Sequence, residues 1–266
     1  MGRKKRMEEI DAYNKGYIDA SMSKEIIVPS DLIASQSAKS LDYKIEIKCK
    51  NKKQKDLLKL LKDETKQICI VHGSAGSGKS YISLAYALSA LKDDTNSFEK
   101  IIIVVPTLQA VSSALQIGYL KGSLEEKILP SISSDSYTME KILKNSGNLG
   151  AKTIINTLIA EGKIEFRILN HMLGCNIDNS IIIMSEAESF NRDEVLLLLT
   201  RSNEQSKLIL NGDEAQCCRT DLKKTGSGMK YAIERLAHLD EVAIFEFTDE
   251  DIVRNPLIGK ILEAWK

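Results

Sequence analysis

One eight-residue segment of this sequence combines the residue types that hold polyphosphates. Residues 73–80 read GSAGSGKS, which fits the spacing G-x-x-x-x-G-K-[ST]. Glycines let the backbone turn tightly and bring its N–H groups close to phosphate oxygens. The Lys79 ammonium can reach the β- and γ-phosphates, and the Ser80 hydroxyl can bind Mg²⁺. The segment predicts a loop for ATP or a close relative of ATP, with Gly73, Ser74, Ala75, Gly76, Ser77, Gly78, Lys79 and Ser80 as nucleotide-binding residues.

A second group of residues suited to catalysis follows the apolar run at 181–184. Nucleotide hydrolysis needs a group that positions water and an acid that holds Mg²⁺ through water. An Asp-Glu pair is expected there, but this sequence has Ser185 and Glu186. Glu186 can polarise the attacking water, whereas Ser185 replaces a hydrogen bond of about 1.5–3 kcal/mol by a neutral one of about 0.5–1.5 kcal/mol. We therefore expect that ATP binding depends less strongly on Mg²⁺ and that turnover is slower. The residues on the metal side would be Ser80 and, through a water molecule, Ser185. The alternative interpretation of Glu186 is that it is an exposed residue at the end of a strand.

Both groups lie at the ends of short apolar runs that alternate with amphipathic segments. Such strand–helix repetition predicts an α/β fold with a parallel sheet and helices on both sides. The run at 164–169 is interrupted by charged residues, which favours a place near the sheet edge. Residues 1–43 are predicted to form a polar arm, and residues 44–266 a single domain. The predicted strands are 68–71, 101–105, 164–169, 181–184, 208–210 and 242–247, with helices at 81–91, 193–200 and 230–239.

The composition is that of a globular protein and singles out no partner by charge. The 266 residues include 37 basic and 37 acidic ones, so any electrostatic attraction must come from local patches. No apolar run approaches the roughly 18–20 residues of a membrane span. The five cysteines are scattered and odd in number, which favours reduced thiols. We expect a cytoplasmic protein without a membrane partner.

Several motifs follow one another along residues 51–265 in an order that is specific as a set. Together they resemble the PhoH family, the phosphate-starvation-inducible ATPases, including members encoded by phages. The family is similar to the first RecA-like domain of superfamily 1 helicases, so the resemblance implies a P-loop NTPase fold. Besides the loop, the motifs are Gln54, 118–127 (GYLKGSLEEK), 199–201 (LTR), 211–216 (NGDEAQ), 227–229 (SGM) with 233–236 (IERL), and 251–257 (DIVRNPL).

The resemblance implies roles for three further residues. Gln54 would read the adenine edge, while Asp213 and Gln216 would sense the γ-phosphate and couple it to movement. The sequence also departs from the family pattern at Ser185, at Val105, where an arginine is usual, and at 173–176 (LGCN), where the family has an arginine-rich segment. Losing those cations removes groups that would offset transition-state charge.

Two functions remain open on these residues. The first is an ATPase that acts on RNA or single-stranded DNA and works as a homo-oligomer, for instance a hexamer, because one RecA-like domain lacks the second wall that closes over ATP. The second is a nucleotide-gated regulatory or binding protein with little or no hydrolysis. A small-molecule kinase is a weaker third option.

Three other features have competing interpretations. Arg254 is an arginine-finger candidate or a surface partner of Asp249 or Asp251. Asp213 could compensate for Ser185 on the metal side, or could be a turn residue. The lysines of residues 44–55 form either a phosphate-binding patch or a solvated face.

Overall fold

A six-stranded parallel sheet forms the centre of the molecule in the computed structural model, which describes residues 42–106, 124–203, 205–217, 219–253 and 264. Its strand order is β3-β2-β4-β5-β1-β6, and every neighbouring pair is parallel. The six apolar runs of the sequence are these six strands, and the charged run at 164–169 is indeed an edge strand, which confirms both predictions. The strands are β1 (Ile68–Gly73), β2 (Lys100–Val105), β3 (Ile164–Ile168), β4 (Ser180–Met184), β5 (Lys207–Gly212) and β6 (Val242–Phe247).

The interior strands are buried on both faces, which explains their unbroken apolar sequences. Almost every residue of β2, β4 and β5 is buried. Successive residues point to opposite faces, so Ile101 and Ile103 enter one core cluster while Ile102 and Val104 enter the other. The sheet therefore divides the described part of the molecule into two hydrophobic layers.

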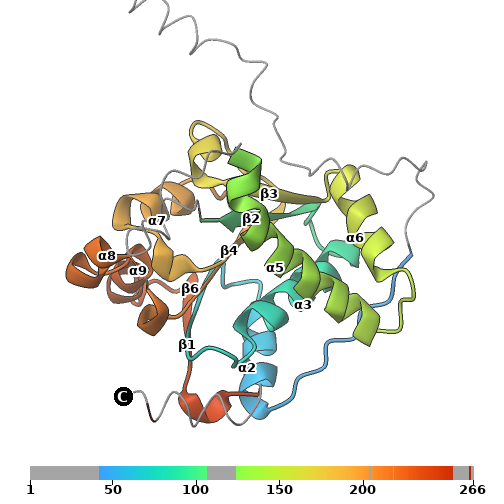
Figure 1. Cartoon of the computed structure of the whole chain (residues 1–266), viewed down its shortest axis with the longest axis horizontal. Helices are drawn as coiled ribbons and strands as arrows, with labels where there is room; N and C mark the ends of the chain where they lie inside the picture. Colours follow the sequence, from blue (N-terminus) through green and yellow to red (C-terminus); the bar gives the residue numbers. More distant parts are fainter. Residues whose placement is uncertain (1–41, 107–123, 204, 218, 254–263, 265–266) are drawn as a thin grey trace, which may run out of the picture.

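Helices cover both faces of this sheet (Figure 1). One side carries α3, α5 and α6, and the other carries α7, α8 and α9. The predicted helices 81–91, 193–200 and 230–239 correspond to α3, α7 and α9, whereas the sequence pattern did not single out α2, α5 or α6. The bounds are α2 (Lys52–Leu61), α3 (Lys79–Lys92), α5 (Leu124–Asn145), α6 (Ala151–Ala160), α7 (Arg192–Leu199), α8 (Thr220–Thr225) and α9 (Gly228–Leu236).

Helix α5 has an acidic residue within its buried stripe. Ile132, Met139 and Ile142 recur at helical spacing and are buried in the core beside α3. Asp135 lies on the same stripe and is only 6% exposed. A carboxylate at a core-facing position needs a partner, and this one lies above the carboxyl end of the sheet.

The end of the predicted arm packs against the domain. Tyr43 is buried, and its hydroxyl donates a hydrogen bond of 3.1 Å to the Leu88 carbonyl of α3. Lys92 pairs with Asp42 at 2.7 Å. The docked chain therefore includes Asp42 and Tyr43, and the rest of the predicted arm, residues 1–41, lies outside the described residues. In the described ranges no helix has the length and apolarity to cross a membrane.

Candidate nucleotide-binding site

The loop of residues 73–80 joins the interior strand β1, next to the edge strand β6, to helix α3 and takes its shape from backbone geometry. Gly73 has φ +115° and Gly78 has φ +94°, values that side-chain-bearing residues rarely adopt. A Cβ on Gly73 would lie 1.9 Å from the Phe247 carbonyl oxygen, and one on Gly78 would lie 2.5 Å from Gln54 Nε2. Both positions thus require glycine. Because α3 begins at Lys79, its unpaired N–H groups face the loop and form an anion site.

Neighbouring segments hold the loop in this shape without any ligand. The Ser77 hydroxyl donates to the Ser74 carbonyl at 2.8 Å, and Ser74 bonds to the Asp249 carboxylate. The Val253 amide donates to the Gly76 carbonyl at 3.1 Å. The turn after β6 therefore braces the loop from outside, so the amides are arranged before a phosphate arrives.

Lys79 is folded back onto its own loop. Its Nζ donates to the carbonyls of Gly73 at 2.6 Å and Ser74 at 3.0 Å. Burial lowers the pKa of Lys79 below its usual value, while Asp213 and two other nearby carboxylates oppose that effect. The ammonium group is thus held within reach of the loop by weak acceptors that a phosphate can replace.

Gln54 supports the loop from helix α2. It is 2% exposed, its Nε2 donates to the Ser77 carbonyl at 2.8 Å, and its Oε1 accepts from the Lys50 amide at 2.7 Å. The structure thus places Gln54 beside the loop, as a brace for the backbone. Its reading of adenine stays a prediction.

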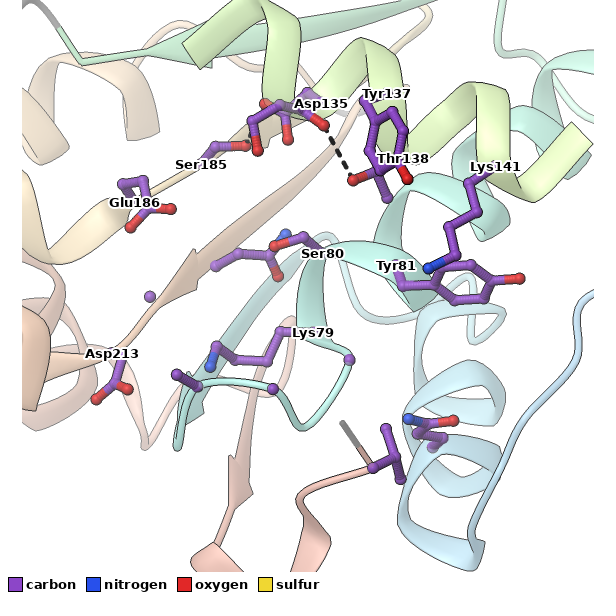
Figure 2. Close-up of a pocket in the computed structure, with 18 of the residues that line it drawn as sticks. Lys79, Ser80, Tyr81, Asp135, Tyr137, Thr138, Lys141, Ser185, Glu186 and Asp213 are labelled. Atoms are coloured by element: carbon purple, nitrogen blue, oxygen red, sulfur yellow. Dashed lines mark hydrogen bonds between the residues drawn. The ribbon is translucent and has the colours of Figure 1, made fainter. Parts of the chain in front are cut away.

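A cavity of about 660 Å³ opens in front of the loop, and the end of β4 forms its opposite wall (Figure 2). Ser185 is 7% exposed, and its hydroxyl donates to Asp135 Oδ2 at 2.9 Å. Burial raises the pKa of Asp135 to about 6, since the charge of Glu186 adds to that effect and the Ser185 hydrogen bond only partly offsets it. The carboxylate absent from position 185 therefore has a counterpart on α5 (Figure 2).

Glu186 lies beside Ser185 in a conformation uncommon for its residue type. Its φ of 54° and ψ of 48° are left-handed, which is costly outside glycine and concentrates at functional sites. Behind it lies Glu188, 2% exposed, whose Oε2 accepts from the Asp213 amide at 3.0 Å. Burial, reinforced by the neighbouring Glu186, raises the pKa of Glu188. Glu186 is thus the outer member of an acidic pair and faces the cavity.

Asp213 and Gln216 form a turn at the end of β5. Gln216 Nε2 donates to Asp213 Oδ2 at 2.8 Å, and the Ala215 amide donates to Asp213 Oδ1 at 3.1 Å. Both residues line the cavity near Lys79. Their role as sensors of the γ-phosphate stays a prediction, and the turn explains the position of Asp213 on structural grounds as well.

The structure brings together residues that lie far apart in the sequence. The strand that ends at Ser185 is not adjacent to the strand of the loop, because β5 lies between β4 and β1. The start of α3 nevertheless faces the end of β4, because α3 packs across β2, β4 and β5. Arg254 lies outside the described residues. The predicted residues that line the cavity are Gln54, Ala75, Gly76, Gly78, Lys79, Ser80, Ser185, Glu186, Asp213 and Gln216, whereas Gly73, Ser74 and Ser77 shape the loop behind it.

The donor set fits Mg²⁺ bound together with a nucleotide. Ser80 and Ser185 supply hydroxyl oxygens to one cavity, and Mg²⁺ prefers such oxygen ligands. Within the described ranges no cluster of three His, Cys, Asp or Glu side chains could hold a metal ion alone. The ion would therefore be shared between the protein and phosphate oxygens, as is usual for Mg²⁺.

Sequence reasoning missed Asp135 and Glu188. Asp135 had a detectable signal, because an acid at the spacing of Ile132 and Met139 interrupts an apolar helical stripe. For Glu188 the sequence signal was only its closeness to Glu186. Its contact with the Asp213 amide depends on tertiary structure.

The lysines of residues 44–55 do not form one uniform face. Lys48 and Lys50 line the cavity, whereas Lys53 lies over the Phe245 ring at 5.3 Å from its centroid. Lys48 also pairs with Glu46 at 3.2 Å. Their use as a nucleic-acid patch stays a prediction.

Comparison with known proteins gives a consistent result. The sequence model of the PhoH-like protein family matches residues 46–266. A PhoH-like protein of Bacillus subtilis (strain 168) is 34% identical over 194 residues, which are 73% of this chain and 56% of the relative. Protein PhoH of Escherichia coli (strain K12) is 33% identical over 223 residues, which are 82% of this chain and 58% of the relative.

A PhoH-like protein of Mycobacterium leprae (strain TN) is 30% identical over 194 residues, covering 73% of this chain and 51% of the relative. The chain thus spans little more than half the length of these curated relatives.

Proposed function

The chain belongs to the PhoH-like protein family, and on that premise we propose that it binds ATP with Mg²⁺ and hydrolyses it slowly. The observation that carries the proposal is that the loop of residues 73–80 faces Ser185 and Glu186 across one cavity. Its volume, about 660 Å³, lies within the range of small-molecule sites.

The proposal assigns a task to the loop, to Lys79 and to Glu186. The loop amides and the start of α3 bind the phosphates, and Lys79 exchanges its contacts with the Gly73 and Ser74 carbonyls for phosphate oxygens. Glu186 positions the attacking water. When bound, Mg²⁺ neutralises charge on the phosphate oxygens. Because position 185 has no carboxylate, we expect slower turnover than an Asp-Glu pair would support.

We further propose a homo-oligomer, for instance a hexamer, that acts on RNA or single-stranded DNA. In the described part of the chain one parallel sheet borders the cavity, so a neighbouring copy could close it from outside. In such an assembly Arg254 is the candidate for a finger toward the neighbour's nucleotide. The lysines that border the cavity, Lys48 and Lys50, are candidates for nucleic-acid phosphates.

The test measures ATP binding by calorimetry, and phosphate release with and without single-stranded RNA. Lys79→Ala should weaken ATP binding by about a hundredfold, because it removes charge-assisted bonds to phosphate. Lys59→Ala, at an exposed position of α2, is the matched control and should bind as the wild type does. Binding that Lys79→Ala leaves intact would overturn the nucleotide site, and turnover unaffected by RNA would remove the nucleic-acid part.

The second candidate is a nucleotide-gated regulatory or binding protein. The neutral Ser185 at the end of β4 favours it, because that position would otherwise support metal-assisted hydrolysis. This function predicts ATP binding that Lys79→Ala abolishes, with phosphate release at background level under every condition. Release above background that the same substitution abolishes would exclude it.

A further inference from the structure

The side chain of Asp135 is a buried acid at the edge of the nucleotide cavity. It comes from α5, is 6% exposed, and lines the cavity with Ser80 and Ser185. Among the described residues, its side chain accepts one hydrogen bond, the 2.9 Å contact from the Ser185 hydroxyl. No ion pair between described side chains includes it.

A buried carboxylate without a cation is costly for a protein to keep. Removing the charge from water is unfavourable unless a cation or several hydrogen bonds compensate. One neutral hydroxyl supplies only part of that compensation. The cavity, however, is where a nucleotide-bound cation would arrive. The position of Asp135 therefore makes sense if its countercharge is brought by the ligand.

We propose that Asp135 supplies the magnesium-side carboxylate that position 185 lacks, acting through the Ser185 hydroxyl. This inference rests on the proposed binding of ATP with Mg²⁺. Ser185 donates its hydrogen to Asp135, which leaves the serine oxygen as an acceptor polarised by the carboxylate behind it. Together the two side chains perform the task of one aspartate at the end of β4. Asp135 is thus a positioning residue on the metal side.

Two other acids at this end of the sheet, Asp213 and Glu188, are already engaged. Both carboxylate oxygens of Asp213 accept hydrogen bonds within its own turn, from Ala215 and Gln216. Glu188 accepts from the Asp213 amide. The expectation that Asp213 could compensate for Ser185 is therefore less well supported by geometry than the direct contact between Asp135 and Ser185.

The experiment compares ATP affinity in excess Mg²⁺ with ATP affinity in EDTA, by calorimetry on the full chain. The dissociation constant in EDTA divided by that in Mg²⁺ measures how much the metal strengthens ATP binding. This ratio does not depend on the stability of the fold. Asp135→Asn should reduce this ratio by about tenfold, since a charge-assisted bond becomes a neutral one. The double variant Asp135→Asn with Ser185→Asp moves the carboxylate back to the strand and should restore the ratio to within about threefold of wild type.

Glu140→Gln is the matched control. It removes one charge from the same helix, where Glu140 pairs with Lys144 at 2.6 Å, and should leave the ratio unchanged. Thermal melting establishes that each variant folds. If Asp135→Asn does not fold, Ser185→Ala replaces it, because loss of the hydroxyl must lower the ratio by a similar factor.

The outcomes separate this inference from the proposed function. Wild-type protein that binds no ATP overturns both. Wild-type protein that binds ATP without any gain from Mg²⁺, or an unchanged ratio in Asp135→Asn, overturns the role of Asp135 alone. An unchanged ratio together with a lower melting temperature would show that Asp135 only anchors Ser185.

Discussion

The loop of residues 73–80 and the wall that faces it, made by α5 and by the ends of β4 and β5, line one cavity but carry their chemistry differently. The loop offers backbone amides within eight consecutive residues, and three of its glycines have positive φ. The wall uses side chains, and two that meet there, Ser185 and Asp135, lie 50 positions apart in the chain. A backbone site needs particular glycines in a particular order, whereas a side-chain site needs only that a group reaches the right place.

This difference has a consequence for how each wall can vary. A carboxylate can be supplied from a helix instead of a strand, because the folded chain brings both to the same point. No other segment can supply the loop amides, since their directions depend on the turn from β1 into α3. We therefore expect substitutions in the loop to be costly and substitutions in the wall to be tolerated.

The largest expected effect comes from Gly73→Ala. Its Cβ would lie 1.9 Å from the backbone oxygen of Phe247, at a φ of +115° that alanine disfavours. Backbone atoms cannot move aside as the end of a side chain can. We therefore expect a loss of about 4 kcal/mol in the free energy of unfolding. Urea denaturation measures it. Gly150→Ala is the control: its Cβ would meet no atom of the other described residues within 4 Å beyond its chain neighbours, so stability should change by less than about 1 kcal/mol.

A loss in Gly73→Ala no larger than that of Gly150→Ala would contradict the view that the loop is fixed by its backbone. The contact with Phe247 would then be one that the end of β6 can relieve by moving.

Gln54→Ala should have the next largest effect, because Gln54 connects α2 to the loop. Truncation leaves the Ser77 carbonyl and the Lys50 amide without their side-chain partner. Loss of two buried hydrogen bonds should lower the free energy of unfolding by about 2 kcal/mol. Comparison of ATP and GTP affinities then separates two roles of the glutamine. An adenine reader would lose its preference for ATP, whereas a brace alone would weaken both nucleotides equally.

The sequence was sufficient for the parts of the molecule that local pattern controls. The six strands and the loop depend on contiguous residues, so apolar runs and glycine spacing predicted them. Helix α5 was not singled out, although its buried stripe from Ile132 to Ile142 has helical spacing, because that stripe includes Asp135. The pairing of Asp135 with Ser185 could not be predicted, since it depends on how α5 lies over the sheet.

The smallest expected effect is that of Gly212→Ala, which places the same methyl group in the side-chain wall. There the nearest atoms to the Cβ would belong to side chains: Met229 Sδ at 2.5 Å, and at 2.7 Å Glu188 Oε2, which accepts from the Asp213 amide. Methionine adapts readily to a changed space, so we expect a loss of about 1 kcal/mol in the free energy of unfolding, measured by the same urea denaturation. A loss equal to that of Gly73→Ala would mean that this wall is as rigid as the loop. In that case the tolerance inferred for the wall, and with it the ease of moving a carboxylate from strand to helix, would no longer follow from the difference between backbone and side-chain sites.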